Sequence, residues 1–240
     1  MSRAPTKADA RAVFERNAQR AIACHRCPEL RAYIAQVARE KKRAYRDEVY
    51  WGKPVPAFGD PQARLLIVGL APGAHGSNRT GRMFTGDQSG RWLFRALHRA
   101  GFASQETWQR PDDGLRLTGC TITAALRCAP PGNKPTPKQL QNCTVHLAAD
   151  FELFEPRLRA IVSLGAIGHR AAVKMLEERG WLFEHRPVFA HGAEHVAVRD
   201  GRELRVLCTY HPSQQNTNTG VLSEAMFDAV WSRAREIVES

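Results

Sequence analysis

The sequence predicts an α/β fold with a central, mainly parallel sheet of four or five strands flanked by helices on both faces. Continuous apolar runs of strand length, typical of parallel strands buried on both faces, occur at 64–70, 120–126, 160–164 and 204–210. Segments with helical periodicity separate these runs, and polar loops directly follow them. Because no internal repeat or linker interrupts this alternation, we expect one domain over residues 1–240.

The helices between the strands are predicted from their apolar periodicity. They span Ser89–Ala100, Pro137–Phe154 and Ile167–Arg179, and a last helix extends from Leu222 toward the C-terminus. Within Val188–Val198 the alternation of residue types predicts a further strand or a hairpin.

The N-terminal segment, about residues 1–50, is expected to be helical. Residues 7–46 carry the helical pattern, and a pair of cysteines interrupts it. Pro28 is suited to begin the second helix, because proline is well tolerated in the first helical turn.

The chain is basic, since 35 Lys and Arg residues against 24 Asp and Glu residues give a formal charge of +11. Basic groups placed at phosphates release condensed counterions, so this balance favours a polyanionic partner such as nucleic acid. No stretch has the apolar length of a signal peptide or of a membrane span. We therefore expect a cytoplasmic protein without a membrane partner, and a monomer.

Four of the six cysteines fall into two pairs, Cys24 with Cys27 and Cys128 with Cys143. In a compartment that keeps thiols reduced, such clusters are more often metal sites than disulfides. Four thiolates suit either zinc or an iron–sulfur cluster. The other two cysteines, Cys120 and Cys208, lie in apolar runs and are predicted to be core residues.

The conspicuous polar motifs follow predicted strands, and in open parallel sheets the ligand site lies beyond the carboxyl ends of the strands. The first such loop, 69–87, is glycine-rich and allows close backbone approach to a ligand, although it matches neither a P-loop nor a dinucleotide-binding motif. Phe84 in this loop is either a core residue or a stacking surface for a base. Asp87 either caps the next helix or orients a water and stabilises positive charge.

The second and third loops carry further candidates. Asn133 is either a turn residue or an amide that reads the edge of a nucleobase. His211 follows the last predicted strand, and Pro212 rigidifies the turn after it. A run of residues that suit a phosphate, a DNA groove or the space left by a flipped base comes next, namely Ser213, Gln214, Gln215 and Asn216.

These loops and the cysteine spacing resemble those of the iron–sulfur uracil-DNA glycosylases, specifically the family-5 (UDGb-type) group of the uracil-DNA glycosylase superfamily. The matching segments are 69–87, 127–137 and 211–220, and the resemblance extends from about residue 20 to the C-terminus. It implies a uracil-DNA glycosylase-like fold and a monofunctional DNA glycosylase acting on DNA. Such an enzyme flips out and excises uracil and other deaminated bases, hypoxanthine and xanthine, and leaves an abasic site for base excision repair.

The resemblance also implies roles for particular residues. A structural [4Fe–4S] cluster would be held by Cys24, Cys27, Cys128 and Cys143. Phe84 would stack on the flipped base, beside a base-binding wall formed by Gly69, Ala71 and Gly73. Asp87 and His211 would flank the glycosidic bond, and Asn133 would be the base-reading or water-positioning amide.

One position separates this chain from the sister iron–sulfur family, which carries an Asn just upstream of the third cysteine. Here the corresponding residues are Thr123, Ala124 and Ala125. The uracil-selective amide is therefore missing, which implies broader tolerance of deaminated bases.

Two other functions remain compatible with the residues. One is a non-catalytic, zinc-stapled nucleic-acid-binding protein that uses the same cysteines and the same basic surface. The other is a nucleotide-processing hydrolase with a phosphate in the glycine-rich loop, although the loops lack the clustered carboxylates that Mg²⁺ needs.

Overall fold

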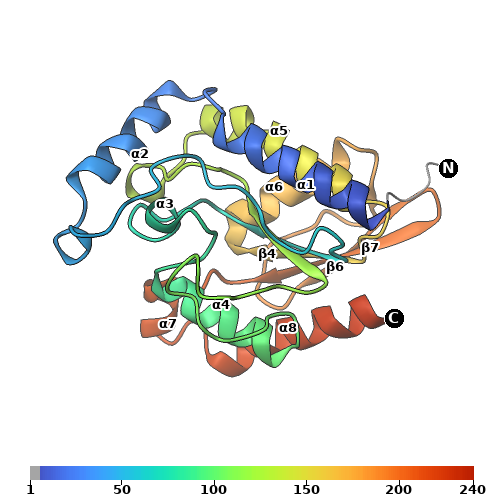
Figure 1. Ribbon diagram of the computed structural model, residues 1–240. Coiled ribbons are helices and arrows are strands. Elements are labelled where there is room, and N and C mark those ends of the chain that lie inside the picture. The colour runs from blue at the N-terminus through green and yellow to red at the C-terminus, as the bar shows by residue number, and fades with distance from the viewer. Residues whose placement is uncertain (1–5) are drawn as a thin grey trace.

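The computed structural model describes residues 6–240 and is built on a seven-stranded sheet with the strand order β1-β3-β2-β4-β7-β6-β5 (Figure 1). The strands are β1 (Phe58–Gly59), β2 (Leu65–Gly69), β3 (Cys120–Ala124), β4 (Ala160–Leu164), β5 (Leu182–Phe183), β6 (Glu194–Arg199) and β7 (Arg202–Thr209). The helices are α1 (Lys7–Ile22), α2 (Pro28–Glu40), α3 (Ser77–Thr80), α4 (Gln88–Arg99), α5 (Pro137–Phe154), α6 (Gly165–Glu177), α7 (Gln214–Asn218) and α8 (Glu224–Glu239). Two 3₁₀ turns are η1 (Arg43–Tyr45) and η2 (Pro131–Asn133).

The predicted fold class is confirmed, and the strand count is larger than expected. Strands β3, β2, β4 and β7 run parallel, whereas β1, β6 and β5 add to the edges in antiparallel pairs. The expectation of four or five strands missed β1 and β5, which have two residues each and are too short to form a recognisable pattern. The parallel strands are buried on both faces, as their apolar runs predict.

Helices cover both faces of the sheet, and the core therefore has two layers. Helices α1, α5 and α6 lie on one face, and α4 and α8 lie on the other (Figure 1). Alternate residues of β2 divide between the two layers: Leu65 and Ile67 pack toward α4 and α8, and Leu66 and Val68 pack toward α5 and α6. Leu93 and Trp231 from the helices complete the first layer.

The N-terminal segment is helical, as predicted, with residues 1–5 lying outside the described residues. Thr6 and Asp9 form a capping box at the start of α1. The Asn17 side chain donates to the Ala149 carbonyl on α5 at 2.9 Å, so that α1 is joined to the helical layer. Pro28 begins α2. Within residues 6–240, no helix is both long and apolar enough to cross a membrane.

Candidate active site

A cavity of about 1660 Å³ lies at the carboxyl ends of β2, β3 and β7, where the three predicted loops meet. Because these strands are parallel, the loops after them emerge at one edge of the sheet. The lining includes the following predicted site residues: Gly69, Ala71, Gly73, Phe84, Asp87, Asn133, His211, Ser213, Gln214 and Gln215. Asn216 is not among the residues that line it.

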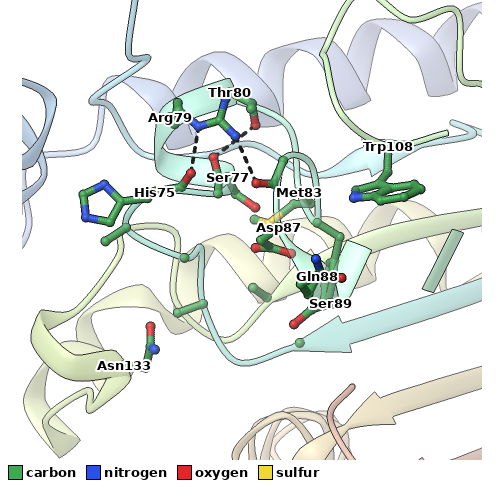
Figure 2. Close-up of a pocket in the computed structure, with 18 of the residues that line it drawn as sticks. His75, Ser77, Arg79, Thr80, Met83, Asp87, Gln88, Ser89, Trp108 and Asn133 are labelled. Carbon is green, nitrogen blue, oxygen red and sulfur yellow. Dashed lines mark hydrogen bonds between the residues drawn. The ribbon is translucent and has the colours of Figure 1, made fainter. Parts of the chain in front are cut away.

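Asp87 is held at the start of α4 with one oxygen engaged. Its Oδ1 accepts a hydrogen bond from the Gly90 amide at 3.0 Å, which makes Asp87 the N-cap of the helix. Its Oδ2 lies against the backbone of Gly73 and Gly76, and a Cβ at Gly76 would collide with it. Figure 2 shows Asp87 below the α3 turn that carries Ser77. The carboxylate therefore caps the helix and also lines the cavity, and its role toward a water or a positive charge stays a prediction.

The pKa of Asp87 is raised above its usual range, chiefly because burial disfavours the charged form. Hydrogen bonds from the Gly90 and Ser89 amides and the positive charge of Arg79 oppose this shift. The carboxylate therefore combines poor solvation with fixed donors, as is common for groups that act in catalysis.

Phe84 and His211 form an aromatic pair in the cavity lining. Their rings are stacked with centroids 5.8 Å apart and an interplanar angle of 30°. Phe84 adopts a left-handed backbone conformation, with φ of 55°, which turns its ring onto Gly69. A Cβ at Gly69 would lie 3.3 Å from the Phe84 ring, so glycine allows this close approach.

Burial lowers the pKa of His211 to about 4. The imidazole is therefore neutral at physiological pH and can donate one hydrogen bond while accepting another. A neutral donor of this kind stabilises a developing negative charge without first being protonated.

Asn133 reaches the cavity from η2, on the side away from Asp87 (Figure 2). It is exposed, and its φ of 58° is a left-handed conformation that asparagine tolerates better than most residues. Its turn position and its access to the cavity are both observed, so the two sequence interpretations are compatible here.

The third loop contains a short helix, α7, that the sequence did not indicate. Ser213 is its N-cap and accepts a hydrogen bond from the Asn216 amide at 3.3 Å. The Asn216 side chain donates to the His211 carbonyl at 2.8 Å and so helps to fix the backbone position of His211. Gln214 and Gln215 are exposed at the cavity rim. A DNA contact by any of these residues stays a prediction.

Arg79 holds the glycine-rich loop in shape. Its Nε donates to the His75 carbonyl at 2.8 Å and its Nη2 donates to the Gly86 carbonyl at 2.9 Å (Figure 2). Its guanidinium also pairs with Glu48 and lies 3.9 Å from the centroid of the Tyr45 ring. This buried arginine therefore joins both ends of the loop to the N-terminal segment.

His75 and Asn78 complete this frame. The Asn78 amide donates to the Ala74 carbonyl at 3.3 Å within the loop. His75 lines the cavity, and its Nδ1 lies 3.1 Å from the Tyr50 hydroxyl. Burial, Lys42 and Arg79 all lower the pKa of His75, so it stays neutral at physiological pH.

Two segments of the wall were missed by sequence reasoning. One is the N-terminal segment, which contributes Lys42, Tyr45, Glu48 and Val49. The other is the loop 108–112, whose Trp108 lies beside α4 and accepts a hydrogen bond from the Gly86 amide through its carbonyl at 2.9 Å. An isolated tryptophan directly before the polar stretch Gln-Arg-Pro-Asp was a usable signal for the second segment. The first had none, because only tertiary packing brings it to the cavity.

The four paired cysteines line a second, smaller cavity between α2, α5 and the loop after β3. Two hydrogen bonds reach their sulfurs: the Arg127 amide donates to Cys143 Sγ at 3.3 Å, and the Asn142 side chain donates to Cys27 Sγ at 3.5 Å. Burial raises the pKa of Cys128 to about 12 and that of Cys143 to about 11. Thiolates at this place therefore need a bound cation to compensate their charge.

Buried polar atoms without partners border the same cavity. They are Arg127 Nε, Arg127 Nη1 and His146 Nε2, and both residues line the cavity. Buried donors are rarely left unsatisfied, so these atoms point to a polar or anionic occupant. On its other side, Arg127 pairs with Asp150, which accepts a hydrogen bond from the Thr123 hydroxyl at 2.7 Å. This buried network connects the cysteine cavity to β3.

Comparison with known proteins agrees with this geometry. Residues 56–235 match the family model described as the uracil DNA glycosylase superfamily. The chain is 48% identical over 219 residues to a Type-5 uracil-DNA glycosylase of Thermus thermophilus, covering 91% of this chain and 95% of that protein. It is 45% identical over 223 residues to one of Mycobacterium leprae, covering 93% and 94%.

A more distant relationship is visible as well. A Type-4 uracil-DNA glycosylase of Pyrobaculum aerophilum is 27% identical over 165 residues, which cover 68% of this chain. The match to these Type-5 relatives covers more than nine tenths of the chain. The chain therefore belongs to the uracil-DNA glycosylase superfamily and, within it, to the Type-5 uracil-DNA glycosylases.

Proposed function

We propose that this chain is a monofunctional DNA glycosylase that flips uracil out of DNA, cleaves its glycosidic bond and leaves an abasic site for base excision repair. The observation that carries the proposal is the meeting of Asp87, Asn133 and the Phe84–His211 stack in one cavity at the carboxyl edge of the sheet. The names of the Type-5 relatives support uracil as the substrate base. The net charge of +11 supports DNA as the partner.

The chemistry follows from the charges that develop as the bond breaks. The sugar becomes positive and the departing base becomes negative. Asp87, when ionised, stabilises the sugar cation or positions the attacking water. Neutral His211 donates to the anionic base, and Phe84 supplies a face on which the base stacks. Asn133 offers an amide for the base edge or for the water.

Hydrolysis is favoured over a Schiff-base reaction. Among residues 6–240, the lysine that lines the cavity is Lys42, which comes from the segment before η1 and not from the loops that carry Asp87 and His211.

Gln214 and Gln215 at the rim are suited to occupy the space that a flipped base vacates. We expect the enzyme to act as a monomer.

The base pocket also favours hypoxanthine and xanthine as substrates. One part of the cavity lining, Gly69, Ala71, Gly73 and Ala124, has no polar side chains. Such a surface reads a base by shape and through its backbone groups, and carries no side-chain amide with which to reject a purine.

The four-cysteine cavity is proposed to hold a structural [4Fe–4S] cluster on Cys24, Cys27, Cys128 and Cys143. The gathering of the four cysteines around one cavity, the two hydrogen bonds to sulfur and the unpaired donors of Arg127 support it. Its contribution is to join the N-terminal helices to α5 and to the loop that carries Asn133.

Replacing either Asp87 or His211 should strongly slow excision. We expect Asp87→Asn and His211→Asn to lower the single-turnover rate on a U·G duplex by at least about 100-fold, the usual scale for groups that stabilise charge in the transition state. Asparagine preserves the N-cap of α4, so the first variant should fold normally. The control is Asp112→Asn, an exposed acid on the same cavity, which should leave the rate within about two-fold. Wild-type rates in both test variants would refute the assigned roles.

The rate should fall on acidification because Asp87 must be ionised. Its pKa is raised, so the acid limb of the pH–rate profile should have its midpoint above the ordinary value of 3.8. His211, with its pKa lowered to about 4, should cause no change near 6.5, the ordinary value for histidine. The limb should vanish in Asp87→Asn and persist in His211→Asn. A midpoint at or below 3.8 would contradict the proposed role of the buried carboxylate.

Hypoxanthine and xanthine should be released as well as uracil, each within about 100-fold of the uracil rate. Introducing an amide by Ala124→Asn should lower the rates on hypoxanthine and xanthine, relative to the rate on uracil, by at least about 10-fold, because purines would leave that amide unpaired. Ala124→Val is the control for added bulk at this buried position. A wild-type enzyme that acts on uracil alone would overturn the proposed breadth and leave the glycosylase assignment intact.

The purified protein should be brown and contain about four iron and four sulfide ions per chain. Cys128→Ser should lose the iron and the colour, whereas Cys120→Ser, which changes a buried cysteine elsewhere in the sheet, should retain both. Elemental analysis measures the iron content, and visible absorption measures the colour. A colourless protein with one zinc ion per chain would exclude the cluster.

A further inference from the structure

A second group of metal-ligand side chains lies away from the cysteine cavity. His169 on α6, His195 on β6 and Cys208 on β7 each offer one ligand atom, and these atoms lie within 4.8 Å of one another. None of the three lines the active-site cavity or the four-cysteine cavity. Cys208 is buried, as its apolar sequence context predicts.

Both imidazoles are oriented by backbone carbonyls. His169 Nε2 lies 3.2 Å from the Pro187 carbonyl, and His195 Nε2 lies 3.0 Å from the Val188 carbonyl. A carbonyl only accepts, so each Nε2 carries the proton and each Nδ1 keeps its lone pair. This is the arrangement in which histidine binds metals, because the second ring nitrogen fixes the tautomer and the ring orientation.

Without a metal, Cys208 and His169 form a neutral hydrogen-bonded pair. His169 Nδ1 lies 3.2 Å from Cys208 Sγ, so without a metal the thiol donates to the imidazole. Burial, His195 and Arg170 lower the pKa of His169, which keeps the ring neutral. Burial raises the pKa of Cys208 to about 11. Metal binding at this pair would replace the thiol proton, which leaves to solvent.

We propose that His169, His195 and Cys208 form a further metal site that takes a zinc-class divalent ion. Two neutral nitrogens and one thiolate are a donor set that zinc accepts, with a solvent molecule as the fourth ligand. His169 and Cys208 are buried, and His195 is partly exposed and opens the site to solvent. The ion joins α6 to β6 and β7, the strand that leads into His211. Its role is thus to stiffen this edge of the sheet.

The test uses the purified full chain with its cysteine cavity loaded as isolated. Co²⁺ is the spectroscopic probe, and Zn²⁺ is the competitor. Wild-type protein should develop a thiolate-to-cobalt charge-transfer band that saturates at one equivalent and disappears when Zn²⁺ is added. Zn²⁺ at a hundred-fold excess over its Kd should also raise the Tm by about 5–10 °C.

Two ligand variants and one control separate this site from the others. Cys208→Ser should lose the band, and so should His195→Ala, which changes a partly exposed position and is expected to fold. Cys120→Ser, at a buried cysteine outside the group, should keep both the band and the Tm increase. The proposal fails if wild-type protein shows no saturable band, or if the band and the Tm increase survive in His195→Ala. In that event, the three residues form only a hydrogen-bonded core contact.

Discussion

The parallel alignment of β3, β2, β4 and β7 is the constraint on which the rest of the structure depends. Parallel neighbours end at the same edge, so the loops after β2, β3 and β7 converge although they are far apart in the chain. Residues near 87, 133 and 211 thereby share one cavity. The two helical layers stabilise this alignment by burying both faces of the strands.

Local interactions then set the chemistry at that edge. Asp87 caps α4 and faces the cavity with the same carboxylate, so helix formation and carboxylate placement are coupled. Glycines at 69, 73 and 76 let Phe84 and Asp87 approach the backbone closely, where a Cβ would intrude. Burial raises the pKa of Asp87 and lowers that of His211, which leaves two groups of different character in one cavity.

Much of the fold and of the site could be predicted from local pattern. The long strands were recognisable because burial on both faces requires unbroken apolar runs, and α5 was predicted with its observed bounds from its helical periodicity. In the structure, Thr136 and Gln139 form a capping box at its start. The strands β1 and β5 escaped because two residues carry no period. The helix α7 escaped because Ser213 and Asn216 read equally well as loop residues, and the N-cap contact is visible only in three dimensions.

The sequence by itself determined the fold class, the family and the three loops that line the cavity, because strand burial, glycine spacing and cysteine spacing are local properties of the chain. Only the tertiary structure decided which of these residues act together. Three interactions join residues from separate elements. They are the ion pair of Arg79 with Glu48, the network of Arg127, Asp150 and Thr123, and the group of His169, His195 and Cys208. The physical reason is that burial, pKa and ligand geometry depend on distances in space, which packing of the sheet and helices sets and which no local pattern encodes.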